Sequence, residues 1–500
     1  MTRPQDLECD VLVVGLGPVG AALTAMVGQT DRSVIAIEPQ RDVYPLPRAA
    51  HVDHEIMRIF QSLGIIDEIA PHVRVAPNYE FRAADGRVLM RMEREGVIGA
   101  SGWPVGYNLY QPGIERAVRD RLAHLPSAQA LYGSRFVAFE GSDEDHVTAS
   151  VVSDEVGDRQ IHARLVVGCD GAWSPVREAC GIGLDDYGFD EPWLVLDALV
   201  ADETAFPPLN LQLCDPDRPT TYVHMGPGRL RWEFMLKPQE DPEAMRRPES
   251  IDALLTPWRK LGDIKVERTA VYRFHGLVAQ HWRQGRVLLA GDAAHQMPPF
   301  MGQGLCSGLR DAANLAWKID AVLASDDLSL LDSYQAERDA HVRFVIERAI
   351  EMGRVVCTLD HALAAARDAE MLPNPRIGAP PPFPSIRGAT LGDTAAAGAI
   401  FPQTVVEGEG RLDDILGPGA WLISDGTIPD ASGLQKDGVK IVNLDEDLPS
   451  GSAQAVASWF RQQDVETVLV RPDRYVFGTG RPEQLLEAWN CAITPSKASV

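Results

Sequence analysis

The sequence predicts an α/β fold in which a parallel-sheet domain is interrupted by an antiparallel sheet, resumes, and is followed by a small α/β unit. Three observations support this prediction. Residues 10–27 contain a buried-strand run, a glycine-rich turn and an apolar helix. Short alternating segments over 192–274 are typical of an antiparallel sheet. A second buried run at 286–290 and long helices over 307–354 then repeat the first pattern.

The composition indicates a globular protein and disfavours some kinds of ligand. A chain of 500 residues is long enough for roughly two to four domains. Its content of 45% hydrophobic and 24% charged residues is ordinary for a globular protein. The 47 basic and 71 acidic side chains give a formal charge of −24, which disfavours binding to nucleic acid or to an anionic membrane. An anionic substrate therefore requires a local Arg or Lys.

The cysteines and the N-terminus predict a cytoplasmic protein. The seven cysteines are scattered and form no Cys-x-x-Cys pair, which favours reduced thiols over disulfides or a zinc site. The first ten residues are polar, unlike a signal peptide, and no apolar run approaches the roughly 20 residues of a membrane span. No histidine–carboxylate cluster has metal-ligand spacing, so we expect no metal.

Hydrophobic periodicity places the individual elements. In the first domain we expect strands at 33–37, 136–139, 147–152 and 161–167 and helices at 51–63 and 111–122. In the antiparallel sheet we expect strands at 194–199, 210–214, 221–225 and 230–236, with a hairpin turn at 226–228. In the C-terminal unit we expect strands at 420–423, 440–443, 467–470 and 474–477 and a helix at 453–462.

These elements divide the chain into five predicted segments. The clearest linker is the proline-rich run at 373–384 (PNPRIGAPPPFP). The predicted boundaries are 1–190 for the first part of the parallel-sheet domain, 191–280 for the antiparallel-sheet domain, 281–372 for the resumed domain and its long helices, 373–388 for the linker and 389–500 for the C-terminal domain.

The turn Gly15-Leu16-Gly17-Pro18-Val19-Gly20 connects the first strand to its helix. Gly15 allows the tight turn, Gly17 lets a pyrophosphate approach the backbone, and Gly20 lets the helix pack on the strand. Glu38, at the end of the second strand, is placed to accept hydrogen bonds from a ribose diol. The pattern predicts a Rossmann-like dinucleotide-binding domain and does not separate FAD from NAD.

Two further turns also follow buried strands. Asp170-Gly171 follows one strand run, and Gly291-Asp292 follows another. The turn Gly302-Gln303-Gly304 then opens a long helix, whose N–H groups and positive dipole end favour a bound anion. Taken singly, such turns are common in loops without any ligand.

Taken together and in this order, the three motifs resemble those of the class A flavoprotein aromatic hydroxylases. Within that family the chain is most similar to 3-(3-hydroxyphenyl)propionate hydroxylases, with local matches at 47–55, 231–235, 302–304, 307–318 and 470–476. The resemblance implies a Rossmann-like FAD-binding domain interrupted by an antiparallel-sheet substrate domain, plus a C-terminal thioredoxin-like domain. Because that last domain lacks Cys-x-x-Cys, a packing or dimer role is expected for it.

The resemblance also implies cofactor roles. We expect tightly but non-covalently bound FAD, and NADH or NADPH that binds transiently. Asp170 is implied to lie where the two nucleotides meet. The other residues implied to contact FAD are Gly15, Gly17, Pro18, Val19, Gly20 and Glu38 at the ADP half, Arg48 and Gln111 at the phosphates and ribityl chain, Gly291 and Asp292 at the ribityl hydroxyls, and Pro299, Gly302 and Gly304 beside the ring.

The implied activity is monooxygenation of a phenolic ring with NAD(P)H and O2 through a C4a-hydroperoxyflavin, as in aromatic catabolism. The expected substrate is of the 3-(3-hydroxyphenyl)propionate type. One alternative is a hydroxylase of the same fold that acts on resorcinol, a nitrophenol or a polyketide. Others are a flavin dehydrogenase or reductase that does not use O2, and a non-catalytic nucleotide-binding protein. A homodimer is left open.

Candidate substrate-binding residues lie on the hairpin at 221–236. Alternation divides it into a face with Tyr222, His224, Leu230, Trp232 and Phe234 and a face with Val223, Met225, Arg231 and Glu233. The resemblance favours the Arg231 face, and Tyr222, His224 and Pro299 are kept as further candidates for substrate binding. The alternative for Arg231 and Glu233 is an exposed cross-strand ion pair.

His51 is the candidate catalytic residue. It follows Arg48 at a position that lines the flavin pocket in the related hydroxybenzoate hydroxylases. A neutral imidazole there can accept the phenol proton. The alternative is a histidine that caps the following helix. His54 and His295 are expected to make structural hydrogen bonds, and no Gly-x-Ser-x-Gly elbow supports a hydrolase.

Overall fold

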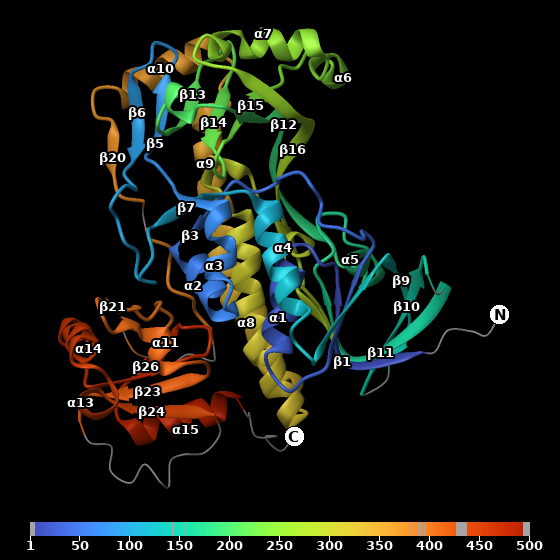
Figure 1. Ribbon diagram of the computed structural model, residues 1–500, viewed down its shortest axis with the longest axis vertical. Coiled ribbons are helices and arrows are strands. Elements are labelled where there is room, and N and C mark those ends of the chain that lie inside the picture. The colour runs from blue at the N-terminus through green and yellow to red at the C-terminus, as the bar shows by residue number, and fades with distance from the viewer. Residues whose placement is uncertain are drawn as a thin grey trace.

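The computed structural model of the protein describes residues 6–142, 145–155, 157–380, 382–388, 392, 394, 396–426 and 438–493. Helix α8 (Gly304–Ser325) runs through the middle of the molecule in Figure 1. The sheet that contains β1 and β11 lies to the right of this helix, the sheet that contains β12 to β16 lies above it, and the C-terminal unit lies to its lower left. Helix α8 therefore borders all three regions.

The first sheet has a parallel centre in the order β18-β11-β1-β2-β8. Residues Val11–Val14 of its middle strand are buried and apolar, as expected for a strand with both faces covered. Helix α1 (Pro18–Gly28) follows that strand and packs on α8. The strands of this sheet are β1 (Leu7–Val14), β2 (Val34–Glu38), β8 (Ala128–Tyr132), β9 (Ser134–Ser142), β10 (Val147–Ser153), β11 (Gly157–Gly168), β17 (Arg283–Gln284) and β18 (Val287–Leu289).

The chain leaves this sheet after β11, builds most of a second one, and returns at β17 and β18. The second sheet has the order β19-β16-β12-β15-β14-β13-β5-β6-β20. Its last strand, β20, comes from the proline-rich segment and pairs with β6, so part of the predicted linker is an edge strand. Its strands are β5 (Tyr79–Ala83), β6 (Val88–Met92), β12 (Leu184–Val200), β13 (Asn210–Cys214), β14 (Thr220–His224), β15 (Arg229–Met235), β16 (Ile264–Ala279), β19 (His295–Gln296) and β20 (Arg376–Gly378).

The C-terminal unit has a four-stranded sheet in the order β24-β23-β25-β26. Strand β23 is parallel to β24, whereas β25 is antiparallel to both of its neighbours. Helices α14 (Ser450–Gln463) and α15 (Pro482–Ile493) contribute to separate hydrophobic clusters of this unit. The strands are β23 (Ala420–Ser424), β24 (Val439–Asn443), β25 (Thr467–Val470) and β26 (Val476–Thr479).

Other elements connect and cover these sheets. Helix α7 covers a face of the second sheet that carries the aromatic side chains of Tyr222, Trp232 and Phe234, and α9 follows α8 in the centre of the molecule. The remaining bounds are β3 (His51–Asp53), β4 (Val73–Val75), β7 (Gly106–Leu109), β21 (Val405–Val406), β22 (Gly410–Arg411), α2 (His54–Leu63), α3 (Ile66–Ile69), α4 (Gln111–Leu122), α5 (Pro175–Ala179), α6 (Pro242–Met245), α7 (Pro248–Arg259), α9 (Asp332–Val356), α10 (His361–Met371), α11 (Leu412–Leu416) and α13 (Leu444–Asp447).

The helix predicted at 51–63 starts later than expected. His51–Asp53 is strand β3, which pairs with β7, and helix α2 begins at His54. The Asp53 carboxylate caps this helix by accepting hydrogen bonds from the backbone N–H groups of Glu55 and Ile56. The interpretation of His51 as the capping residue is therefore wrong, since Asp53 occupies the cap and His51 lies on the preceding strand.

Candidate functional site

The three sequence motifs meet around the N-terminus of α1. Gly15 has a φ of +99°, and a Cβ there would lie 2.5 Å from the carbonyl oxygen of Cys169, the residue before Asp170. Gly291 packs against Val19 of the same turn. Turns that are far apart in the sequence thus form one continuous surface of closely packed backbone.

The residues of this surface fit a dinucleotide. The Glu38 carboxylate accepts a hydrogen bond of 2.8 Å from the Leu16 N–H group, which fixes it beside the glycine turn. No atom lies within 4 Å of the Cβ position of Gly17, so the backbone there is open to a phosphate. Asp292 is exposed and makes no hydrogen bond or ion pair with the part of the chain that the structure describes. These features are those that an FAD pyrophosphate and ribityl chain require.

The Gln111 side chain lies beside the backbone of Arg48. The Gln111 side-chain oxygen accepts hydrogen bonds from the backbone N–H groups of Arg48 and Ala49, at 3.0 and 2.7 Å. Gln111 therefore positions the segment that carries Arg48. The Arg48 side chain is exposed and stacks on Tyr44, so its guanidinium is accessible to a phosphate.

Asp170 has a local structural role. Its carboxylate accepts hydrogen bonds from the Ser174 hydroxyl and from the Val176 N–H group at the start of α5. Burial raises the pKa of this carboxyl. Arg177 of α5 donates to the carbonyl oxygen of Ala293, beside Asp292. Asp170 thus organises a helix that joins the second motif to the third.

A cavity of about 170 Å³ lies between these motifs and one face of the second sheet. Its walls come from the segment Arg48–His51, the turn Pro299–Gly302 with Gly304, and β14 and β15. His51 and Gly302 approach closely: Gly302 has a φ of +65°, and a Cβ on it would lie 3.0 Å from the His51 Cβ. The turn that starts α8 therefore packs directly on the candidate catalytic histidine.

Burial and the positive charge of Arg94 lower the pKa of His51 to about 3. The imidazole is therefore neutral at physiological pH. A neutral ring of this kind can accept a hydrogen bond, but it is a weak base. An efficient general base has a pKa near the pH at which the enzyme works. His51 does not meet this requirement, so another side chain of the cavity is better suited to accept the proton.

Glu233 is such an acceptor. Its side chain lines the cavity and is buried, and burial raises the pKa of its carboxyl to about 6. Among the described residues, its ion-pair partner is the Arg231 guanidinium, and the two groups are 3.7 Å apart. This carboxylate can therefore change protonation state near neutral pH inside the cavity.

Arg231 lines the same cavity, but its guanidinium is already engaged. It donates to the Asp197 carboxylate at 2.7 Å and to the backbone carbonyls of Pro47 and Arg48. The predicted alternative, an exposed cross-strand pair with Glu233, is wrong because both side chains are buried and lie on β15. Arg231 therefore holds the segment before His51 against the sheet.

The structure does not bring Tyr222 and His224 to the cavity. Tyr222 stacks on Trp258 of α7 at 4.9 Å, and the His224 ring bonds the Pro207 carbonyl oxygen at 2.8 Å. Strand alternation directs both side chains to the face covered by α7, whereas Val223 lies on the cavity side. The prediction that Tyr222 and His224 bind the substrate does not fit this placement, because both side chains lie on the face of the sheet opposite the cavity.

The expected structural role of His295 is confirmed. Its ring bonds the buried Asp311 carboxylate at 2.6 Å, and Asp311 also pairs with Arg338. The same carboxylate accepts a hydrogen bond from the Gly291 N–H group. This network fixes the third motif to α8.

A larger cavity of about 880 Å³ adjoins the first one. The two share His51, Arg94 and Met301 in their walls. The larger one is also lined by the proline-rich segment, including Pro382–Pro384, and by Tyr475 of the C-terminal unit. Sequence reasoning did not single out Arg94, since its neighbours Glu93 and Glu95 make the segment resemble a solvated charged loop.

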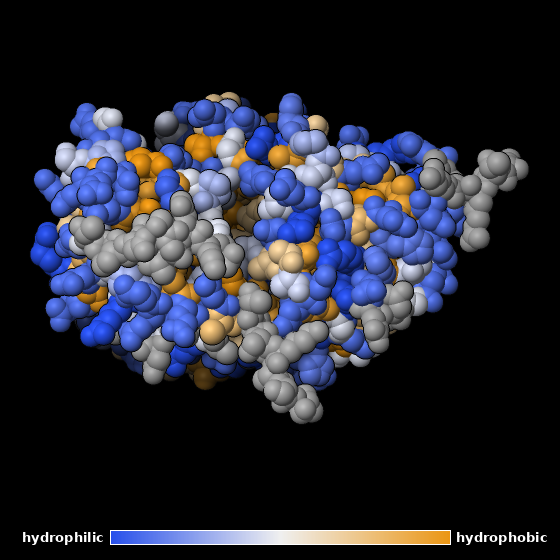
Figure 2. All heavy atoms as spheres, turned by 90° about the horizontal axis from the view of Figure 1, so that it is seen from below, coloured by the Kyte–Doolittle hydropathy of each residue, from blue (hydrophilic) through white to orange (hydrophobic). Residues whose placement is uncertain are grey.

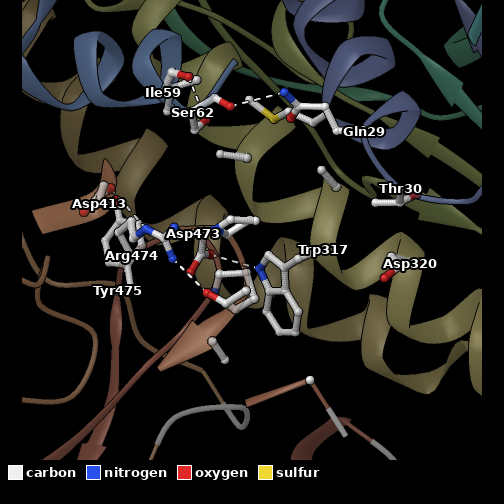
Figure 3. Close-up of a pocket in the computed structure, with 18 of the residues that line it drawn as sticks. Gln29, Thr30, Ile59, Ser62, Trp317, Asp320, Asp413, Asp473, Arg474 and Tyr475 are labelled. Carbon is white, nitrogen blue, oxygen red and sulfur yellow. Dashed lines mark hydrogen bonds and ion pairs between the residues drawn. The ribbon is translucent and has the colours of Figure 1, made fainter. Parts of the chain in front are cut away.

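A third cavity, of about 1,100 Å³, separates the C-terminal unit from helices α1, α2 and α8. Figure 3 shows Trp317 of α8 facing Asp473, and Arg474 directed toward Asp413. These contacts lie beside a fully buried charge network formed by Lys318, Glu337 and Arg471. The segment at 307–318 thus joins the C-terminal unit to the rest of the molecule.

The described residues include neither a helix suited to span a membrane nor a cluster suited to hold a metal ion. No described helix is both long enough and apolar enough to cross a membrane. Within the same residues, no group of three or more His, Cys, Asp or Glu side chains is placed to hold a metal ion. The face in Figure 2 is mainly hydrophilic, with hydrophobic side chains in separate small groups.

The glycine turns and the cavity beside them are the features of a flavoprotein that binds a nucleotide. Residues 8–349 match the family described as "FAD binding domain", and the chain belongs to that family. Residues 398–494 match the family described as "HcaD C-terminal domain".

Curated relatives are named as hydroxylases. A "Probable NADH-specific resorcinol 4-hydroxylase" of Rhodococcus jostii (strain RHA1) is 38% identical, over 94% of this chain and 92% of the relative. A "3-(3-hydroxy-phenyl)propionate/3-hydroxycinnamic acid hydroxylase 2" of Burkholderia vietnamiensis (strain G4 / LMG 22486) is 33% identical, over 93% and 92%. The protein is therefore a flavoprotein aromatic hydroxylase that uses FAD and NAD(P)H.

Solved structures share the fold. Aklavinone-11 hydroxylase, in a ternary complex with FAD and aklavinone, has a TM-score of 0.80 at 22% identity and covers 98% of this chain and 100% of its own. The flavin-dependent monooxygenase PieE, in complex with FAD and substrate, has a TM-score of 0.79 at 22% identity, with the same coverage.

Proposed function

We propose that the protein hydroxylates a single-ring phenol with a short acidic side chain, of the 3-(3-hydroxyphenyl)propionate type. The observation that carries this proposal is the pair of joined cavities. The inner one, of about 170 Å³, is comparable to the cavity of about 150 Å³ that binds benzene in another protein. The outer one leaves room for a side chain on the ring.

A second candidate substrate is resorcinol. It is favoured by the relative from Rhodococcus jostii, whose similarity extends over 94% of this chain. Resorcinol is a single-ring phenol as well, but it carries no acidic side chain. The two candidates therefore differ in whether an anionic substituent is recognised.

The cofactor residues are proposed as follows. The turn from Gly15 to Gly20, with Pro18 and Val19, binds the FAD pyrophosphate, and Glu38 binds the adenosine ribose. Arg48 binds a phosphate, while Gln111 holds the backbone that carries Arg48. Asp292 binds the ribityl hydroxyls, and Gly302 and Gly304 present the N-terminus of α8 to the ring. FAD, reduced by NADH or NADPH, supplies the oxygen-activating chemistry.

The proposed proton chemistry involves two side chains of the inner cavity. The neutral His51 ring accepts a hydrogen bond from the substrate hydroxyl and orients it. The Glu233 carboxylate, whose pKa is raised to about 6, takes the proton and so increases the electron density of the ring. Pro299, in the wall opposite the sheet, limits the access of water to the reacting ring.

The division into domains is also proposed. The boundaries at 280 and 372 are supported by the ends of β16 at Ala279 and of α10 at Met371, whereas β12 (Leu184–Val200) crosses the boundary proposed at 190. A thioredoxin-like C-terminal domain is supported by the strand order β24-β23-β25-β26 with β25 antiparallel to its neighbours. Among its described residues the one cysteine is Cys491, so a packing role is proposed in place of redox activity.

The test is a substrate panel on the FAD-loaded protein. 3-(3-Hydroxyphenyl)propionate, resorcinol and the non-phenolic 3-phenylpropionate are supplied with NADH or NADPH, and hydroxylated product, O2 uptake and nucleotide oxidation are measured together. The proposal expects product in a one-to-one ratio with nucleotide for the acidic phenol. Coupled turnover of resorcinol alone selects the second candidate, and oxidation without product from any phenol contradicts both.

A further inference from the structure

Arg94 lies where the two cavities meet and lines both of them. It follows strand β6, and its backbone N–H group is held by the Asn78 side-chain oxygen at 2.8 Å. The residue is only 7% exposed. Its guanidinium lies 5.2 Å from the centre of the Tyr79 ring, and its one described polar contact is with the Met92 sulfur at 4.0 Å. No described carboxylate pairs with it.

The other buried arginines of this region each have an acidic partner. Arg231 and Arg268 share Asp197, at 2.7 and 3.1 Å. Arg310 pairs with Asp53 and Glu55, each at 2.5 Å. Arg91, a partly exposed arginine three residues before Arg94, also pairs with an acidic residue, Glu80. Arg94 therefore differs from its neighbours in having a buried charge without a described counter-ion.

A buried cation without a partner is unfavourable, because desolvation is not offset by an opposite charge. Burial accordingly lowers the pKa of the Arg94 guanidinium. A guanidinium is also the group best suited to bind a carboxylate or another anionic oxygen, through paired N–H donors. Since the chain carries a net charge of −24, such a local cation is what an anionic ligand requires.

We propose that Arg94 binds an anionic oxygen of the substrate at the junction of the two cavities. This inference rests on the proposed function and specifies its substrate class. With the ring in the inner cavity and the side chain directed into the outer one, Arg94 is placed between them. The anionic oxygen has two chemical sources, a side-chain carboxylate and the phenolate itself, which the test separates.

The test measures ligand binding to the oxidised, FAD-loaded protein by the change in flavin absorbance. The ligands are 3-(3-hydroxyphenyl)propionate, its neutral alcohol analogue 3-(3-hydroxyphenyl)propan-1-ol, and resorcinol. The variants are Arg94→Met and Arg94→Lys. The matched control is Arg87→Met, which removes an equal charge from an exposed arginine on the same hairpin.

Arg94→Met is expected to raise the Kd of the acid by about 10- to 100-fold. If the carboxylate is the source, the alcohol and resorcinol change by less than about threefold. If the phenolate is the source, all three ligands weaken together and the ultraviolet phenolate band of the bound ligand is lost. Both results support the proposal, and Arg87→Met is expected to resemble the wild type in each measurement.

The proposal is overturned if Arg94→Met retains normal FAD content and binds all three ligands with wild-type Kd values. If Arg94→Met does not fold, Arg94→Lys decides, because it keeps the charge and loses the paired donors. Arg94→Lys is then expected either to raise the Kd of the acid more than that of the alcohol or to diminish the phenolate band. If it does neither, the proposal is overturned. Failure of the proposed function is a separate result: wild-type protein that binds the acid but hydroxylates no phenol.

Discussion

The Tyr475 hydroxyl donates a hydrogen bond of 2.6 Å to the Glu55 carboxylate, which joins the C-terminal unit to helix α2. Glu55 also pairs with Arg310 of α8, and Arg310 pairs with Asp53, two residues after His51. All of these side chains are buried. The C-terminal unit therefore helps to position the strand that carries His51, although it lies outside the nucleotide-binding surface.

Tyr475→Phe is expected to lower the apparent Tm and to decrease the yield of product per nucleotide oxidised. The substitution removes a buried hydrogen bond to a charged group, which contributes about 1–3 kcal/mol, and it loosens the support of His51. Both quantities are measured on FAD-loaded protein. Tyr187→Phe is the control, because it removes a hydroxyl bonded to the partly exposed Arg343. Wild-type coupling in Tyr475→Phe would show that this contact does not position the site.

Asp292→Asn is expected to weaken FAD binding while the chain remains folded. Asp292 follows β18 and makes no hydrogen bond or ion pair with the described part of the chain, so the fold does not depend on its charge. The measurements are the flavin-to-protein ratio after purification and the Kd of FAD from quenching of its fluorescence. Asp320→Asn, which alters a surface partner of Arg32, is the control. Full flavin content in Asp292→Asn would remove Asp292 from the cofactor site.

Much of the fold could be predicted from the sequence because its signals are local. The glycine turn before α1, the runs that form β1 and β18, and the alternation in β14 and β15 each lie within one short segment. Helix α4 has the predicted bounds of 111 and 122. The error at His51–Asp53 has a local cause as well: its apolar spacing continues into α2, whereas strand pairing with the distant β7 decides its conformation.

The parts of the site that sequence reasoning missed depend on contacts between distant residues. The pairing of Arg231 with Asp197 joins strands 34 positions apart, and nothing near Arg231 indicates it. Arg94 lies between two glutamates in the sequence, yet the fold directs its side chain to a cavity wall. The face of the hairpin that meets the cavity is set by the packing of α7, which alternation alone does not determine.

Glu233→Gln is expected to raise the apparent Tm at pH 7–8 and to leave it unchanged near pH 4. Burial raises the pKa of this carboxyl from 4.5 to about 6, so the folded protein binds the proton more tightly than the unfolded chain does. The associated stability is fully present below the unfolded pKa and is lost as the pH rises through about 6. The difference corresponds to at most about 2 kcal/mol. A Tm that shifts equally at both pH values would contradict the raised pKa.

The last prediction separates the two side chains proposed to act on the substrate hydroxyl. Since the pKa of Glu233 is raised to about 6 and that of His51 is lowered to about 3, only Glu233 changes charge in the working pH range. kcat/KM for hydroxylation is therefore expected to fall below about pH 6 in the wild-type protein, where Glu233 becomes protonated.

In Glu233→Gln this acidic limb is expected to disappear, and kcat/KM is expected to decrease by about 10²-fold or more, within the range typical of general base catalysis. In His51→Gln, kcat/KM for hydroxylation is expected to decrease at every pH from 5 to 9, while its fall below about pH 6 remains. The reason is that the neutral His51 ring contributes a hydrogen bond but does not change charge in this range. The measurement is product formed per nucleotide oxidised, together with kcat/KM, across that range. An acidic limb that persists in Glu233→Gln and vanishes in His51→Gln would reverse the assignment and make His51 the proton acceptor.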